Sequence, residues 1–163
     1  MCGIVGILSH EPVAQRLIEG LKRLEYRGYD SAGIAIINDN KIQRCRAQGK
    51  IVNLDARLAQ EHIDGIIGIA HTRWATHGMP TEENAHPHMT EDVAIVHNGI
   101  IENYKALRDE LIAKGFSFYS QTDSEVIAQL LTLFEKESDS HLEAIFKTLD
   151  KLEGAYALGI MFK

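Results

Sequence analysis

The sequence predicts an α+β fold, because short apolar strands and a hairpin are mixed with amphipathic helices. The order lacks the regular strand–helix alternation of a doubly wound parallel sheet. The chain has 163 residues, of which 45% are hydrophobic and 25% charged. This is enough chain to bury a core as one domain. We find no internal repeat, low-complexity tract or linker that would mark a domain boundary.

Apolar periodicity predicts each element in the first half of the chain. Residues 13–24 repeat apolar positions at helical spacing, which indicates an amphipathic helix. Asn38, Asp39 and Asn40 are turn residues and predict a hairpin between two flanking strands. The other predicted elements are strands at 4–8, 32–37, 41–46, 66–70 and 93–96 and a short helix at 54–62.

The second half of the sequence is richer in helix. Residues 103–114 form a predicted helix that Gly115 ends, and Thr122 with Glu125 resembles a capping box that opens a helix through 134. Ser140 with Glu143 opens another, through 152. An apolar strand is expected at 155–162. It should have neighbours in a sheet, so we expect the fold to be incomplete at the C-terminus.

Composition excludes several classes of function. The net charge of −6 and the pI near 5.7 argue against nucleic acid as the main partner. No apolar run approaches the roughly 20 residues of a membrane span, and no leader segment is evident. Two cysteines do not make a disulfide framework. A cytoplasmic protein is therefore expected.

Cys2 is the most informative residue, since it directly follows Met1. If Met1 is removed, a thiol and an α-amine with a pKa of about 7.7–8.0 lie on one residue, which then holds a nucleophile and a base. Gly3 and Gly6 leave space around this terminus. The alternative is an ordinary start codon followed by a buried cysteine.

Polar and glycine-rich clusters interrupt the apolar segments, and two of them directly follow predicted strands, where sites are commonly built. Each has a structural alternative. Asn98 and Gly99 are a common hairpin-turn pair, Asp123 could be the polar start of a helix, and the first cluster could simply link a helix to a strand. The clusters span residues 27–31, 71–78, 84–88, 97–99 and 122–124.

Six runs of sequence resemble the class II glutamine amidotransferases, whose glutaminase domain is an N-terminal nucleophile hydrolase with an α/β/β/α sandwich. They are CGIVG at 2–6, the segment 17–33, GIAHTRWATHG at 68–78, NAHPH at 84–88, VHNGIIENY at 96–104 and TDSEVIA at 122–128. The runs at 27–33 and 71–78 resemble the members that make glucosamine 6-phosphate, as opposed to asparagine synthetases and phosphoribosyl-pyrophosphate amidotransferases. The resemblance covers essentially the whole chain.

The resemblance implies a role for each matched catalytic residue. Cys2 would attack the side-chain amide of L-glutamine and form a γ-glutamyl thioester, with its own α-amine carrying the proton. The side-chain amide of Asn98 and the backbone N–H of Gly99 would form the oxyanion hole.

The same resemblance implies how glutamine is bound. Arg73 would hold the α-carboxylate through a bidentate contact, and Asp123 would pair with the α-ammonium. The remaining matched residues would surround the substrate or orient the terminus: Thr76 and His77 in the binding loop, Trp74 as a flap, and Arg27 and Gly28 as supports.

The other histidines and Cys45 carry weaker signals. His86 and His88 are two potential metal ligands without a third partner at a known spacing, so we expect no metal and no cofactor. His71 and His97 are interpreted as buried hydrogen-bonding partners beside the site. Cys45, within a predicted strand, is expected to be inert.

The family resemblance covers only a glutaminase unit, residues 1–163, without its C-terminal part or a sugar isomerase domain. Fructose 6-phosphate would bind only to that absent domain, and the full-length enzyme is expected to be a homo-oligomer. Two alternatives stay open. One is a related amidotransferase with another acceptor, and the other is an inactive or partner-dependent fragment.

Overall fold

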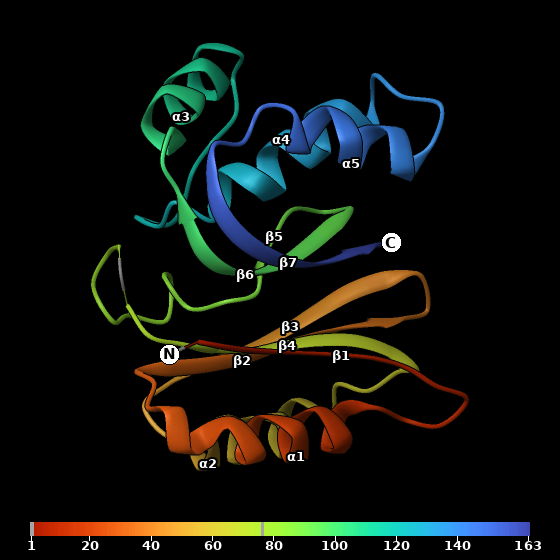
Figure 1. Cartoon of the computed structure of the whole chain (residues 1–163). Helices are drawn as coiled ribbons and strands as arrows, with labels where there is room; N and C mark the ends of the chain where they lie inside the picture. The colour runs from red at the N-terminus through yellow and green to blue at the C-terminus, as the bar shows by residue number, and fades with distance from the viewer. Residues whose placement is uncertain (1, 76) are drawn as a thin grey trace.

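The computed structural model describes residues 2–75 and 77–163, so the expectations for Met1 and Thr76 lie outside the described residues. Two antiparallel sheets stack face to face, and helices cover the outer face of each sheet (Figure 1). The layers are therefore α/β/β/α, as the family resemblance implies. The α+β fold class is confirmed.

The first sheet has the strand order β1-β4-β2-β3, with every neighbouring pair antiparallel. Its strands are β1 (Gly3–Leu8), β2 (Ser31–Asn38), β3 (Lys41–Gln48) and β4 (Ile67–Arg73). Helices α1 (Ala14–Leu24) and α2 (Ile51–Glu61) cover its outer face, and a short 3₁₀ helix, η1 (Glu25–Arg27), follows α1. Leu17, Ile18 and Leu21 of α1 are fully buried against this sheet.

The second sheet has the order β5-β6-β7 and lies against the first. Its strands are β5 (His88–Met89), β6 (Val93–Ile101) and β7 (Gly154–Phe162). Helices α3 (Tyr104–Ala113), α4 (Glu125–Glu135) and α5 (His141–Leu149) lie on its outer side. Ile127 and Leu131 of α4 are fully buried in the core beneath these helices.

Strand alternation builds a third core between the sheets. Ile69 from β4 and Val96 from β6 meet Ala35 and Met161 there. Because side chains alternate faces along a strand, His71 and Arg73 share the inward face of β4 with Ile69. Polar groups that follow the apolar part of β4 are thereby directed between the two sheets, where the site forms.

Most predicted elements are confirmed, with shifts of a few residues at their ends. Residues 97–99, treated as a possible hairpin turn, instead continue strand β6, and Gly99 has a φ of 134° within it. The two-residue strand β5 was not predicted, since its length carries no periodicity. The helix predicted at 54–62 begins three residues earlier, at Ile51.

One capping box is confirmed and the other is wrong. Ser140 caps α5, because its hydroxyl accepts the backbone N–H of Glu143 at 3.2 Å. Thr122 does not cap α4: its hydroxyl lies 3.0 Å from His88 Nε2 instead. Glu125 turns its carboxylate back to the N–H groups of Tyr119 and Ser120, at 2.9 and 2.7 Å. The Thr122 hydroxyl thus contacts His88, 34 residues away in sequence, instead of capping the helix.

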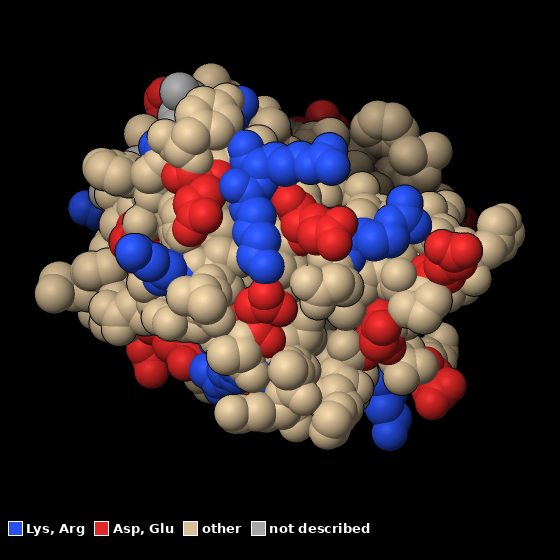
Figure 2. Space-filling model, turned by 90° about the horizontal axis from the view of Figure 1, so that it is seen from below, with Lys and Arg blue, Asp and Glu red and all other residues tan. Residues whose placement is uncertain are grey.

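The outer face of the first helical layer carries charges of both signs, interspersed (Figure 2). One pair, Lys22 on α1 and Asp55 on α2, forms a salt bridge of 2.7 Å between the two helices. This face therefore offers no single-sign patch. Within the residues that the structure describes, none of the helices combines the length and apolar character needed to cross a membrane.

Candidate active site

A cavity of about 560 Å³ opens where strand ends of the two sheets meet. Most of the residues selected from the sequence line it, although they come from segments far apart in the chain. The lining includes Cys2, Arg27, Arg73, Trp74, His77, His86, His97, Asn98, Gly99, Ile100, Thr122, Asp123 and Ser124.

Cys2 lies directly before β1 and is partly exposed to this cavity. Its position is fixed by strand pairing, since Gly3 pairs with Thr72 on β4. The Sγ atom accepts the backbone N–H of Trp74 at 3.1 Å. An added Cβ at Gly3 would come within 2.6 Å of Leu24 Cδ1 and 2.9 Å of Thr72 Oγ1, so a larger residue beside the cysteine would displace these side chains.

Asn98 and Gly99 approach Cys2 from β6 of the other sheet. The Asn98 Nδ2 atom donates to the backbone carbonyl of Cys2 at 3.3 Å, and its Oδ1 atom lies 2.8 Å from His71 Nε2. Gly99 cannot carry a side chain, because a Cβ there would lie 2.7 Å from the Cα atom of Tyr156 on β7. Asn98 and Gly99 therefore lie beside Cys2 in the same cavity.

Arg73 ends β4 with only 3% of its surface exposed. Its Nη1 donates to the carbonyl of Met79 at 3.1 Å and lies 3.5 Å from Asp30 Oδ1. Its Nη2 donates to the carbonyls of His77 and Gly78. The guanidinium therefore organises the loop at 77–79, and all four of its terminal N–H bonds have acceptors.

Asp123 is buried at 3% exposure, two residues before α4. Its Oδ2 accepts the backbone N–H of Ile101 at 2.9 Å, and its Oδ1 lies 3.9 Å from His77 Nδ1. The carboxylate is therefore held at the cavity wall by β6. Asp123 is not simply the polar start of helix α4, since Ser124 occupies the N-cap position of that helix.

Trp74 lines the same cavity as Cys2 and remains 54% exposed. Gly28 makes room for its indole, because a Cβ at Gly28 would come within 2.9 Å of Trp74 Cζ3. Gly28 also has a φ of 74°, which side chains rarely adopt. Arg27 lines the same cavity and its Nε donates to the Tyr26 hydroxyl at 3.3 Å.

Asp30 is a site residue to which the sequence analysis gave no role, although it lies in the cluster at 27–31. Its carboxylate accepts the backbone N–H of Ala75 and contacts Arg73. It thereby joins the start of β2 to the loop after β4. The residue could have been selected only by its place in a polar cluster, because the two partners that tie it to the site, Ala75 and Arg73, are more than 40 residues away in sequence.

Four histidines are buried at or beside the cavity, each at most 5% exposed: His86 and His97 in its wall, and His71 and His88 next to it. Burial lowers the pKa of His71 to about 4 and holds those of His86 and His88 well below the usual value. Burial also lowers the pKa of His97, whose Nδ1 lies 2.8 Å from Ser124 Oγ. These rings are therefore neutral near pH 7, as the interpretation of His71 and His97 as buried partners predicts.

The described part of the chain shows neither a metal centre nor a second reactive cysteine. Residues 2–75 and 77–163 hold no group of three ligand side chains arranged for a metal ion. Cys45 is 1% exposed, and burial raises the pKa of its thiol to about 12, consistent with the expectation that it is inert.

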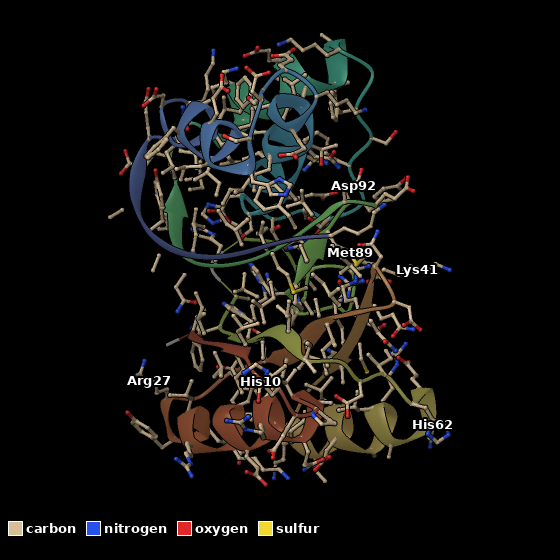
Figure 3. All side chains as sticks on the ribbon, turned by 90° about the vertical axis from the view of Figure 1, so that its right-hand side faces the viewer. His10, Arg27, Lys41, His62, Met89 and Asp92 are labelled. Carbon is tan, nitrogen blue, oxygen red and sulfur yellow. The ribbon has the colours of Figure 1, made fainter. Side chains whose placement is uncertain are left out.

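A larger cavity, of about 850 Å³, is lined by Arg44, Arg46 and Met89. Figure 3 shows Met89 beside the end of β3 marked by Lys41, on the opposite side of the view from Arg27. This cavity has no cysteine among its lining residues, whereas the smaller one holds an accessible thiol. The smaller cavity is therefore the candidate active site.

Solved structures share this architecture. The glutamine phosphoribosylpyrophosphate amidotransferase from B. subtilis superposes with a TM-score of 0.81 at 30% identity, covering 99% of this chain and 35% of that one. A glutamine aminotransferase class-II domain protein from Silicibacter pomeroyi matches with a TM-score of 0.63 at 18% identity, covering 99% of this chain and 73% of that one. The fold is that of the N-terminal nucleophile hydrolases.

Residues 71–163 match the family model described as "Glutamine amidotransferase domain", and the chain belongs to this family. It is 59% identical over all 163 residues to glutamine–fructose-6-phosphate aminotransferase [isomerizing] from Rhizobium meliloti (strain 1021). The protein of the same name from Zymomonas mobilis is 57% identical over the same length. The chain spans 27% of the length of each of these relatives.

Proposed function

We propose that this chain is a glutaminase unit that hydrolyses L-glutamine to glutamate and ammonia through a γ-glutamyl thioester on Cys2. The observation that carries this proposal is the placement of the Cys2 thiol in one cavity with Asn98, Arg73 and Asp123. These four side chains provide a nucleophile, a neutral donor, a fixed cation and a fixed anion. That set matches the amide and the zwitterionic end of glutamine.

The chemistry begins with proton transfer from the Cys2 thiol to the α-amine of the same residue, which requires removal of Met1. The sulfur attacks the amide carbon, and Asn98 Nδ2 and the Gly99 N–H stabilise the oxyanion. The C–N bond then breaks, and ammonia leaves with the transferred proton. Water attacks the thioester, releases glutamate and restores the thiol.

Substrate binding has to rearrange the contacts of Arg73. Its terminal N–H bonds already have acceptors, three of them carbonyls of the loop at 77–79. A bound α-carboxylate therefore replaces some of these carbonyls, and the loop moves with it. Asp123 receives the α-ammonium, while Thr76 and His77 complete the loop around the substrate and Trp74 limits the access of water.

The acceptor of the ammonia is proposed from the names of the relatives. We assign residues 1–163 to the glutaminase unit of a cytoplasmic, homo-oligomeric protein that makes glucosamine 6-phosphate from fructose 6-phosphate. The sugar would bind in the region of such a protein that this chain does not span. A unit with a different acceptor is the alternative, and amino-sugar formation from fructose 6-phosphate distinguishes the two.

The direct test of the proposed function compares two cysteine variants. Cys2→Ala should abolish glutamate release from L-glutamine, because no other accessible thiol lines the cavity. Cys45→Ala removes the second cysteine and should leave turnover unchanged, since that thiol is buried and protonated. Normal turnover in Cys2→Ala would refute the proposal.

A further inference from the structure

His71 makes a contact that crosses from one sheet to the other. It lies on β4, is 0% exposed, and its Nε2 atom is 2.8 Å from Asn98 Oδ1 on β6. The same Nε2 atom is 3.0 Å from the backbone carbonyl of His97. Among the described residues, Asn98 lines the candidate active-site cavity, whereas His71 lies behind it.

The two acceptors fix where the proton of His71 lies. A backbone carbonyl can only accept a hydrogen bond, so Nε2 must carry the hydrogen. Nδ1 has no hydrogen-bond partner among the described residues. Burial lowers the pKa of this histidine to about 4, so near pH 7 the ring holds one proton and that proton is on Nε2.

The proton on Nε2 in turn fixes the amide of Asn98. With Oδ1 toward His71, the amide accepts from Nε2–H, and Nδ2 is left to donate toward the carbonyl of Cys2 at 3.3 Å. Rotating the amide by half a turn would set two donors against each other at His71. It would also set two acceptors against each other at Cys2.

We infer that His71 is a positioning residue that holds the Asn98 amide with its N–H group directed to the Cys2 side of the cavity. The inference rests on the proposed function, in which that N–H stabilises the oxyanion. His71 acts only through Asn98. Without the His71 donor, the amide can turn and present an oxygen to the developing negative charge.

The experiment measures kcat and KM for L-glutamine in the natural protein and in a set of variants. His71→Gln keeps an N–H donor at similar reach, whereas His71→Met has similar length and no donor. Asn98→Ala and the double variant His71→Met/Asn98→Ala complete a double-mutant cycle. His88→Met is the matched control, because His88 is equally buried but its Nε2 contacts Thr122 and not Asn98.

We expect Asn98→Ala to lower kcat by about 10²–10³, the usual effect of losing one oxyanion donor. His71→Met should lower kcat by roughly tenfold or more with little change in KM, and His71→Gln should recover most of that loss. In the Asn98→Ala background, His71→Met should lower kcat by at most about a further threefold. The control His88→Met should leave kcat close to that of the natural protein.

Two different failures can be distinguished. Full kcat in Asn98→Ala would overturn both the oxyanion role and the inference. A large loss in Asn98→Ala with normal kcat in His71→Met, or with losses that multiply in the double variant, would overturn the inference alone. If His71→Met does not fold, ¹⁵N NMR of the unmodified protein decides: a protonated Nε2 supports the inference, and a protonated Nδ1 overturns it.

Discussion

The Sγ atom of Cys2 accepts the backbone N–H of Trp74 at 3.1 Å, although 72 residues separate them in the sequence. Antiparallel pairing of β1 with β4 creates this contact, because the start of one strand meets the end of the other. The proposed nucleophile is therefore tied to the loop that follows Arg73. Changes in that loop should affect the reactivity of Cys2 as well as substrate binding.

Replacing Arg73 by lysine should lower kcat/KM for L-glutamine by about 100-fold. Lysine cannot reproduce the planar fork that contacts the carbonyls at 77–79 or grip a carboxylate through two bonds, and a misplaced substrate costs a factor of this order. Steady-state kinetics measures the loss. The control is the substrate analogue without the α-carboxylate. If Arg73→Lys still prefers L-glutamine over this analogue by the natural ratio, Arg73 does not bind the carboxylate.

Replacing Gly28 by alanine should displace the Trp74 indole and lower kcat/KM by roughly tenfold or more. The new Cβ would lie 2.9 Å from Trp74 Cζ3, so the ring has to leave its present position in the cavity wall. Trp74 is the single tryptophan of the chain, and its fluorescence reports the displacement.

Gly115→Ala is the matched control for Gly28→Ala. Gly115 also has a positive φ, of 90°, but an added Cβ there meets nothing within 4 Å. Backbone strain of about 1–2 kcal/mol should lower its stability without affecting catalysis. Equal loss of activity in both variants would show that strain, and not contact with Trp74, causes the effect.

Stability should fall as the pH drops from 7 toward 5, because the four buried histidines bind protons more weakly in the folded chain than in the unfolded one. The unfolded state then takes up more protons, which favours unfolding. For His71, with its pKa lowered to about 4, the loss between pH 7 and 5 is about 2 kcal/mol.

Urea unfolding at several pH values measures this dependence. His88→Met should reduce the slope of unfolding free energy against pH, because burial lowers the pKa of His88 well below its usual value in the folded chain. An unchanged slope in His88→Met would contradict the assignment of a neutral buried ring.

Local patterns predicted most of the fold because they reflect forces within one element. The helical spacing of Leu17, Ile18 and Leu21 indicated α1 and its buried face. The wrong predictions concern residues whose conformation is set by tertiary contacts. Thr122 contacts His88 across 34 residues instead of capping α4, and Asn98 continues a strand because β7 pairs beside it.

The candidate site was predictable as a set of residues but not as a set of contacts. Cys2, Asn98 and Asp123 were selected by chemistry and by family resemblance, and the fold brings them to one cavity. The role of Asp30 depends on a hydrogen bond to Ala75, 45 residues away. The carbonyls at 77–79 that accept hydrogen bonds from Arg73 could not be predicted from residue types either, since they are backbone groups.

A variant that retains Met1 should lose glutaminase activity, because acylation removes the α-amine that accepts the thiol proton. A small residue at position 2, such as this cysteine, favours natural removal of Met1. A residue inserted between Met1 and Cys2 to block that removal gives a protein that retains Met1. Intact-mass measurement verifies that Met1 is still present. Normal turnover by protein that carries Met1 would show that the free amine is dispensable.

The most direct test of the proposed function is to quench the protein with acid during turnover of L-glutamine and to map covalent adducts by mass spectrometry. We predict one γ-glutamyl group, attached as a thioester to Cys2 and removed by hydroxylamine, with Cys45 unmodified in the same sample. Glutamate release at the full rate with no adduct at Cys2, or with the adduct at another residue, would contradict it.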